Sequence, residues 1–335
     1  MVIIIEFRRH YMAIKVVESG LSTTVQDLGR PGYYHLGIPI SGGMDRMALR
    51  AANLLVGNNE EAAVLEAVFM GPKLQFSVNS IVAVTGGTMV PIVDGVTMEM
   101  WAPFEVSAGQ TLSFKFLKKG ARIYIAISGG IDVPEVLGSR STYALGALGG
   151  FLGRPLATDD EFTIGSASRK PDIGTHVPVE LRREPNDSVE LRMLPGLYWH
   201  RLTTKSQQSF LNDAWKVAPE ADRIGYRFQG GNKLDFVDRK QPFGAGSDPS
   251  NIVDGCYPYG SIQVPGGTEP IVLHRDAVSG GGYFMLGTVI SADMDLIGQL
   301  QPHTPVRFRS VDMKTALEAR QQYNSKTEEL RSIFQ

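Results

Sequence analysis

Polar residues that could bind or activate a ligand are concentrated between Thr23 and Asn58. This stretch contains the runs T-T-V-Q-D-L-G-R-P-G-Y, G-I-P-I-S-G-G-M-D and A-A-N-L-L-V-G-N. The last run carries an apolar stripe that stops at Gly57, which predicts a helix with Ser41 or Asp45 as its N-cap. Four polar residues would then lie on or near one helix entrance and could bind a polar ligand: Arg30, Ser41, Asp45 and Asn53.

Three strand-like runs end in glycine-containing turns, where successive backbone N–H groups could bind an anion. These turns are Thr85-Gly86-Gly87, Ser128-Gly129-Gly130 and Ser279-Gly280-Gly281-Gly282. A hydroxyl side chain directly before each glycine run would add another hydrogen-bond donor. Ordinary hairpin or bulge turns explain the same pattern, so both interpretations stay open.

Charged side chains could complete such a site, because arginine offers a planar fork for carboxylate or phosphate and an acid can position a group or deprotonate it. The candidates are Arg30, Asp45, Glu66, Arg140, Asp222, Arg223 and Asp276. Asp222 and Arg223 could equally form a structural ion pair at a strand. Glu66 lies in an apolar run, and because a buried unpaired carboxylate is costly, we expect Arg30 to be its partner.

The sequence lacks several well-known motifs for binding nucleotides, metals or biotin. It has no P-loop and no Rossmann glycine spacing, and its six histidines are too scattered for a zinc site, so we predict no metal site. The single cysteine, Cys256, excludes an internal disulfide and is interpreted as a small packed thiol. The only Met-Lys pair, Met313-Lys314, lies in a helical pattern, so we expect no covalently attached biotin.

Composition and charge exclude some classes of partner. The chain has 335 residues, 43% of them hydrophobic and 20% charged, and a formal net charge of −2. That charge gives no electrostatic basis for binding nucleic acid or an anionic membrane. The first eleven residues lack the charge order of a signal peptide and could be an extension, so we expect a cytoplasmic protein.

Short apolar runs separated by turn residues dominate the sequence and favour a mainly β architecture. The runs are 81–84, 97–101, 112–117, 122–127, 189–194, 234–237, 261–264, 271–273 and 283–289. A polar stretch at 166–187 with three prolines is the best domain boundary. The pattern from 311 to 333 predicts a C-terminal helix that is docked by its first turns and frays at its end.

An ordered set of motifs closely resembles the KipA family, which is also known as allophanate hydrolase subunit 2 and as the C subunit of 5-oxoprolinase, within the biotin-dependent carboxyltransferase-domain group. Beyond the Thr23–Asn58 stretch, the motifs include residues 82–87, 127–132, 136–143, 153–156, 222–227 and 260–265. The resemblance covers about residues 12–309. It implies two cyclophilin-like β-barrel domains, at 12–165 and 188–310, followed by a C-terminal helix at 311–335.

The resemblance also implies a function. The chain would be one component of an ATP-dependent 5-oxoprolinase that converts 5-oxoproline to glutamate. Its partners would be a KipI-like B subunit plus an A subunit, and the complex would hold ATP with Mg²⁺. Asp45 and Asp276 are the catalytic candidates on this interpretation. The substrate- or anion-binding candidates are Arg30, Ser41, Asn53, Gly86, Gly87, Ser128, Gly129, Gly130, Arg140, Ser141, Arg223, Tyr226, Gln263 and Tyr283.

Two other functions stay open. As a carboxyltransferase, the chain would move a carboxyl group between biotin and a urea-like acceptor, with biotin carried on another chain. Relatives often have a glutamine where this chain has Val278, so an amide contact to the ligand would be missing here. As a regulatory protein, it would bind a KipI-like inhibitor of a sporulation histidine kinase, and the site residues would then not be needed for catalysis.

Overall fold

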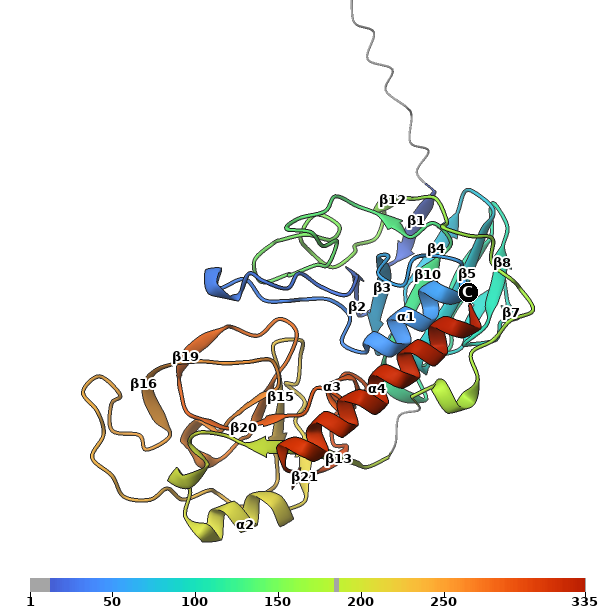
Figure 1. Ribbon diagram of the computed structural model, residues 1–335. Coiled ribbons are helices and arrows are strands. Elements are labelled where there is room, and N and C mark those ends of the chain that lie inside the picture. Colours follow the sequence, from blue (N-terminus) through green and yellow to red (C-terminus); the bar gives the residue numbers. More distant parts are fainter. Residues whose placement is uncertain (1–12, 184–186, 335) are drawn as a thin grey trace, which may run out of the picture.

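The computed structural model describes residues 13–183 and 187–334. Figure 1 shows two strand-rich bodies and a long C-terminal helix that runs along both of them. The first eleven residues, interpreted above as a possible extension, lie outside the described ranges together with residues 12, 184–186 and 335. The mainly β class expected from the short apolar runs is confirmed.

Residues 14–164 form two facing sheets, which we call the sheet pair. The larger sheet has the order β11-β12-β1-β4-β9-β6-β7 and the smaller one β2-β3-β10-β5-β8. Alternate residues of both sheets point into one core, which includes Val16, Leu65 and Ile125. The strands are β1 (Ile14–Glu18), β2 (Ser22–Gln26), β3 (Val64–Val68), β4 (Lys73–Phe76), β5 (Ser80–Thr88), β6 (Pro91–Val93), β7 (Val96–Thr97), β8 (Pro103–Val106), β9 (Thr111–Phe114), β10 (Lys119–Ile127), β11 (Ile131–Asp132) and β12 (Glu161–Ile164).

Residues 189–310 form a closed barrel with the strand order β13-β20-β17-β18-β15-β14-β21. A separate two-stranded sheet pairs β16 with β19. The barrel encloses a core rich in aromatic residues, in which Phe210 and Phe308 stack at 4.7 Å. The strands are β13 (Val189–Pro195), β14 (Trp215–Val217), β15 (Gly225–Gln229), β16 (Asn251–Cys256), β17 (Ser261–Gln263), β18 (Ile271–Leu273), β19 (Gly280–Tyr283), β20 (Met285–Val289) and β21 (Pro305–Ser310).

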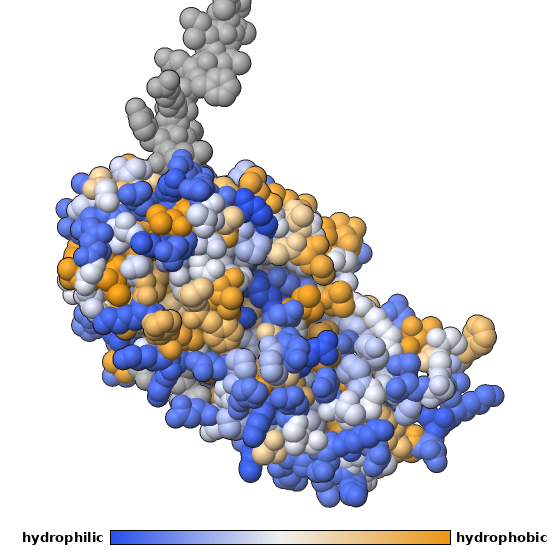
Figure 2. Space-filling model, turned by 180° about the vertical axis from the view of Figure 1, so that it is seen from behind, coloured by the Kyte–Doolittle hydropathy of each residue, from blue (hydrophilic) through white to orange (hydrophobic). Residues whose placement is uncertain are grey.

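No strand of the sheet pair is paired with a strand of the barrel within the described ranges, which agrees with a boundary near 166–187. The proposed domain limits of 12–165, 188–310 and 311–335 remain a prediction. Seen from the side opposite to that of Figure 1, apolar side chains gather mainly on the first body, whereas the second is mostly hydrophilic (Figure 2).

Helices connect and cover these bodies. Helix α1 is capped by Asp45, whose side chain accepts a hydrogen bond from the Ala48 N–H at 3.0 Å, and Gly57 just beyond its end has a φ of 74°, as the sequence predicts. The helices are α1 (Arg46–Leu55), α2 (Thr204–Asn212), α3 (Met294–Ile297) and α4 (Met313–Ile333), with short 3₁₀ turns η1 (Tyr34–Leu36), η2 (Val179–Leu181), η3 (Trp199–Arg201) and η4 (Pro265–Gly267).

The end of α4 is docked, so the prediction of a frayed end is wrong. Leu330 and Phe334 are buried in a cluster with α1, which lies beside α4 in Figure 1. Arg331 adds two hydrogen bonds to the carboxylate of Glu60, at 2.8 and 2.6 Å. The weak amphipathic pattern of the sequence hid this contact because only every third or fourth residue of the polar end faces α1.

Other predicted elements also differ from the structure. Residues 98–101 are not part of a strand, because the backbone turns at Trp101, which has a φ of 63°. Residues 234–237 form no strand because their N–H groups bond to loop partners, such as Leu234 N–H to the Gly267 carbonyl at 2.8 Å. Gly86 and Gly87 lie inside β5, and Gly280 to Gly282 lie inside β19, so neither run is a turn after a strand. Cys256 is exposed instead of packed.

We expect Leu330→Ala to lower the free energy of unfolding by about 2–5 kcal/mol, because the substitution leaves a cavity between α4 and α1. The matched control is Leu317→Ala on the same helix, where the side chain is 46% exposed and the loss should stay within about 0.5 kcal/mol. Urea denaturation measures both. Equal losses in the two variants would contradict the docking of the helix end.

Candidate functional site

The sheet pair and the barrel meet at a buried ion-pair network centred on Glu66. Arg223, which precedes β15, reaches across the junction and donates from Nη1 to Glu66 Oε1 at 2.6 Å. The same guanidinium donates from Nε to Asp276 Oδ2 at 2.7 Å and from Nη2 to the Gly42 carbonyl at 2.8 Å. One arginine therefore holds together a strand of the sheet pair, the loop before α1 and the loop after β18.

A second arginine balances the charge of this network. Arg122 of β10 lies with its Nε 3.6 Å from Glu66 Oε1 and donates from Nη1 to the Tyr226 hydroxyl at 2.5 Å and to the Gly298 carbonyl at 2.7 Å. Tyr124 donates its hydroxyl to Glu66 Oε2 at 2.7 Å. Two arginines thus face two carboxylates, so the buried charges of this group are neutralised.

Burial favours the protonated form of Glu66, but Arg223 and Arg122 outweigh it and lower the pKa of this carboxyl below its usual value. The expected partner, Arg30, is not part of the group, so that prediction is wrong. Arg30 instead donates to the carbonyls of Ser141 and Val136. Burial lowers the pKa of the Arg30 guanidinium, and nearby Asp27 opposes that shift.

Asp45 lies in the interior at the same junction. Its oxygens accept from the Ala48 N–H and from Gln299 Nε2, each at 3.0 Å, and Gln299 in turn accepts from the N–H groups of Ala121 and Arg122. Burial, with a contribution from nearby Asp295, raises the pKa of Asp45 to about 7. Asp45 is therefore a helix cap whose charge changes near neutral pH, and a catalytic role for it stays a prediction.

A third polar cluster forms around Asp27 on the sheet pair. Its carboxylate accepts from the hydroxyls of Ser139 and Ser141 and from the backbone N–H groups of Gly29 and Arg140. The side chain of Arg140 points elsewhere, to Glu135 and the Val133 carbonyl, both at 2.7 Å. Ser141 is thus buried and hydrogen-bonded within this cluster, whereas the Arg140 side chain is partly exposed, and a binding role for either residue stays a prediction.

Several of the predicted binding residues already use their amide or backbone N–H groups in hydrogen bonds within the protein. Asn53 lies near the end of α1 instead of at its entrance, and its amide donates to the Ala62 carbonyl at 2.7 Å. The turn after β10 uses its own N–H groups: Ser128 donates to Ile81, Gly129 to Asn58 Oδ1 and Gly130 to Ile127.

Gly86 is needed for packing, because a Cβ there would lie 2.5 Å from the Arg122 carbonyl, and one on the neighbouring Gly87 would lie 2.8 Å from the Lys119 carbonyl. Both glycines thus allow close approach of β10. The structure gives them no free turn for binding an anion, and that role stays a prediction.

Gln263 and Tyr283 lie apart from the ion-pair network. Together with Asp222, Arg227 and Glu269 they line a hollow of about 770 Å³ on the barrel. Val278, which stands where relatives in the KipA family often have a glutamine, lines the same hollow. Tyr226 is placed differently, because its hydroxyl accepts from Arg122 in the junction. The residues predicted from the sequence therefore divide between the junction and the barrel hollow.

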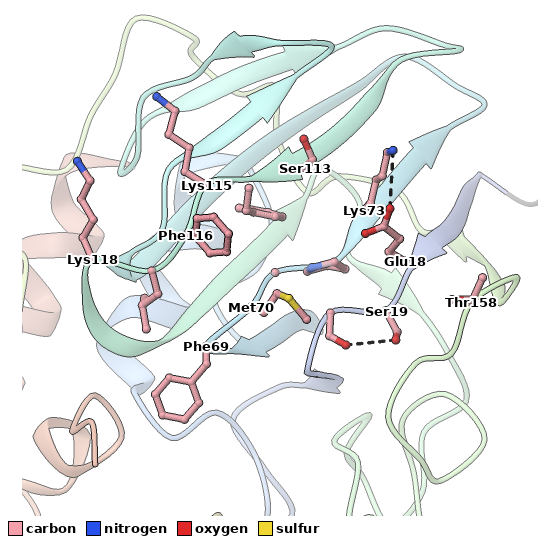
Figure 3. Close-up of a pocket in the computed structure, with 15 residues that line it drawn as sticks. Glu18, Ser19, Phe69, Met70, Lys73, Ser113, Lys115, Phe116, Lys118 and Thr158 are labelled. Atoms are coloured by element: carbon pink, nitrogen blue, oxygen red, sulfur yellow. Dashed lines mark hydrogen bonds and ion pairs between the residues drawn. The ribbon is translucent and has the colours of Figure 1, made fainter. Parts of the chain in front are cut away.

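A further hollow of about 770 Å³ opens on the sheet pair (Figure 3). Lys73, Lys115 and Lys118 surround the apolar side chains of Phe116 and Met70 in this view. Lys73 pairs loosely with Glu18, at 3.9 Å. No residue proposed from the sequence lines this hollow, so it is separate from the candidate site.

Four residues of the junction were not predicted from the sequence: Arg122, Tyr124, Gln299 and Arg275, the last of which follows β18. The strand run that contains Arg122 and Tyr124 was recognised, and a charged residue inside an apolar strand was the available signal. Gln299 stands in a loop without a motif. In the described ranges no group of three or more His, Cys, Asp or Glu residues could hold a metal ion, and no described helix is long and apolar enough to cross a membrane.

We expect Glu66→Gln to lower the free energy of unfolding by roughly 3–5 kcal/mol, because it leaves Arg122 and Arg223 buried with too little opposing charge. The control is Glu190→Gln, whose exposed pair with Arg309 should contribute less than about 1 kcal/mol. Urea denaturation at pH 7 compares them. Similar values for both variants would show that the buried network does not hold the junction.

We expect Asp45 to make the protein less stable as the pH rises. Its folded-state pKa of about 7 lies above the usual value of an aspartate, so its protonated form favours folding at low pH, and that contribution is lost as the pH rises from about 4 through 7. The difference in unfolding free energy between wild type and Asp45→Asn should therefore shift against wild type over this range, by up to about 4 kcal/mol. If the unfolding free energies of wild type and Asp45→Asn, measured by urea denaturation, change in parallel with pH, the raised pKa of Asp45 is contradicted.

A family model and individual relatives of known name place the chain in the same protein family. Residues 36–310 match the family described as carboxyltransferase domain, subdomain A and B. The chain is 35% identical to the C subunit of 5-oxoprolinase from Escherichia coli K12 over 318 residues, which cover 95% of this chain and 97% of that protein. The C subunit of the Haemophilus influenzae 5-oxoprolinase is 31% identical, with 96% of this chain and 98% of that protein covered.

Larger proteins contain the same unit. The chain is 34% identical to the urea amidolyase of Saccharomyces cerevisiae over 88% of its length, but it spans only 16% of that protein. The crystal structure of the K. lactis urea amidolyase superposes with a TM-score of 0.89 at 33% identity, covering 98% of this chain and 20% of that one. The chain therefore belongs to the carboxyltransferase domain family and is a homologue of the C subunit of 5-oxoprolinase.

Proposed function

We propose that this chain is the C subunit of an ATP-dependent 5-oxoprolinase and acts with a KipI-like B subunit plus an A subunit. The observation that carries the proposal is the match to the C subunit of the Escherichia coli 5-oxoprolinase along 97% of that protein. The reaction is 5-oxo-L-proline + ATP + 2 H₂O → L-glutamate + ADP + phosphate. The lactam carbonyl is a poor electrophile, and phosphorylation of its oxygen gives an imidate-like group that water can attack.

The junction supports this proposal with groups that could bind the polar substrate. Asp276 is held in place by Arg223 and lies near Tyr34 and Tyr143. Burial, and then Asp276, raises the pKa of Tyr143, and burial does the same for the pKa of Tyr34 despite the opposing charge of Arg275. Both phenols therefore keep their protons at neutral pH and can donate hydrogen bonds, while the Asp276 carboxylate can accept one from the lactam N–H.

ATP and Mg²⁺ are assigned mainly to the partner proteins in this proposal. The N–H groups of Gly129 and Gly130 already bond to Asn58 and Ile127, so the turn after β10 offers no open phosphate cradle. Gly281 of β19 is likewise paired with Gly255 of β16 in a two-stranded sheet, so this glycine run is not an open phosphate-binding turn either. The role of this chain is then to bind and orient the cyclic amide at the junction, where its carbonyl is activated by a nucleotide from the neighbouring protein.

A second candidate function is carboxyl transfer from biotin to a urea-like acceptor. It is favoured by the superposition on the K. lactis urea amidolyase at a TM-score of 0.89. In this case a biotin carboxylase and a biotin carrier on other chains would supply the carboxyl group. The two functions differ in their products, since one releases glutamate and the other a carboxylated urea.

Glutamate release from 5-oxoproline and ATP tests the proposal, with the chain mixed with its B and A partners. We expect turnover only when the chain is present, and at least about a tenfold loss in Asp276→Asn, because the acceptor for the lactam N–H is weakened. Asp254→Asn, an exposed change on β16, is the matched control and should keep full activity. Unfolding curves of each variant confirm that the fold is intact.

Two outcomes would contradict the proposal. One is glutamate release in the mixture that lacks this chain. The other is no release by the complete mixture although the three proteins co-purify. In that second case, transfer of carboxyl from carboxybiotin to urea is measured next, and its appearance would support the second candidate function.

A further inference from the structure

Arg275 is a buried cation with unused hydrogen-bond donors. Its side chain is 3% exposed, it follows β18 at the junction, and neither Nε nor Nη2 has a hydrogen-bond partner. The guanidinium lies over the ring of Tyr259, 4.8 Å from the ring centroid. Since a buried charge without a hydrogen-bonded counter-charge is costly, this position favours a ligand that brings negative charge.

The two unused groups define the shape of that ligand. Nε and Nη2 lie on the same edge of the planar guanidinium and donate in parallel. This fork matches the two oxygens of a carboxylate, which it can bind with two hydrogen bonds. A carboxylate is therefore the anion that fits the unpartnered edge of Arg275 best.

Two residues that contact Arg275 also have hydroxyl groups without partners. Ser41 is fully buried, and its backbone N–H donates to the Arg275 carbonyl at 2.9 Å, so the two residues are in direct contact. Its Oγ has no hydrogen-bond partner, and neither has the hydroxyl of Tyr259. Ser41 has a φ of 55°, an uncommon value for a residue with a side chain.

The acids around Arg275 interact mainly with other groups, although Oδ1 of Asp295 has no hydrogen-bond partner. Asp276, the next residue, accepts from Arg223 at 2.7 Å. Asp295 of α3 accepts from the Tyr323 hydroxyl at 2.6 Å and lies 3.5 Å from Arg46 Nε. Among the residues that the structure describes, none forms an ion pair with Arg275, so the charge remains available to a ligand.

We propose that Arg275, with Ser41 and Tyr259, forms a carboxylate-binding subsite at the junction of the sheet pair and the barrel. The identity of the ligand rests on the proposed function: the subsite binds the ring carboxylate of a cyclic amide acid such as 5-oxoproline. The lactam group of the same small molecule then faces Asp276, the adjacent residue. Binding at two adjacent residues fixes the orientation of the ring relative to the activating nucleotide.

Calorimetric titration of the full chain tests the subsite, alone and in the complex with its B and A partners. The probes are 5-oxoproline, 2-pyrrolidinone (the same ring without the carboxylate), acetate and inorganic phosphate. We expect Arg275→Gln to weaken binding of 5-oxoproline by roughly 10- to 100-fold, because a charge-assisted pair of hydrogen bonds is lost. Binding of 2-pyrrolidinone should be the same in wild type and variant.

Controls separate binding from folding. Arg309→Gln removes an exposed arginine of β21 that pairs with Glu190, and it should bind every probe as wild type does. Arg275→Lys keeps the charge but loses the fork, so it should recover only part of the affinity. Urea unfolding of each variant identifies any loss of fold, and Ser41→Ala provides a milder second variant with an expected loss of about 3- to 10-fold.

The outcomes distinguish the subsite from the proposed function. Arg275-dependent binding of acetate without binding of 5-oxoproline supports the subsite and contradicts the proposed function. Arg275-dependent binding of phosphate but not of either carboxylate overturns the carboxylate assignment. Equal binding of 5-oxoproline by folded wild type and folded Arg275→Gln, or no binding of any probe to the wild-type complex, overturns the subsite.

Discussion

The structure depends on one buried interaction, the contact of Arg223 with Glu66 and Asp276. The glutamate belongs to β3 of the sheet pair, whereas the arginine and the aspartate belong to loops of the barrel. A buried ion pair is stabilising only if its geometry is good and its remaining hydrogen-bonding groups are satisfied. Here Tyr124 and the Met44 N–H take the second oxygen of Glu66, at 2.7 and 2.9 Å, so the charged group is fully hydrogen-bonded and can fix how the two bodies meet.

Helices α1 and α4 reinforce the same junction from outside the ion-pair network. Asp45 caps α1 and is bonded through Gln299 to the backbone of β10, while Tyr323 of α4 donates to Asp295 of α3 at 2.6 Å. Met44, next to the cap, packs into the core cluster of the barrel. The loop before α1 thus belongs structurally to both bodies, which explains why its polar residues are so dense in the sequence.

The β class, the α1 cap, Gly57 and the position of α4 could be predicted, because strand composition, capping residues and glycine act locally. The candidate site was harder to predict, since its contacts join residues far apart in the chain. Glu66 was recognised as needing a partner, but the nearest arginine candidate, Arg30, was assigned in place of Arg223 and Arg122. The prediction of turns at the glycine runs 85–87 and 279–282 was wrong because Gly86 and Gly281 lie inside strands, where glycine allows close packing. A single sequence does not distinguish this use of glycine from a turn.

Neutralisation distinguishes Arg122 and Arg223 from Arg275 among the described buried arginines of the junction. Arg122 and Arg223 have carboxylates within reach, and Arg30 is hydrogen-bonded to backbone carbonyls at the Asp27 cluster. Arg275 lies over the ring of Tyr259 and forms no ion pair among the described residues, and its Nε and Nη2 have no hydrogen-bond partner. Motif spacing predicted Arg30 and Arg223 as binding residues but not Arg275. The spacing of residues in the sequence does not show which arginines are already paired with a carboxylate. A substrate that carries its own carboxylate would complete at Arg275 what Glu66 already provides for Arg122 and Arg223.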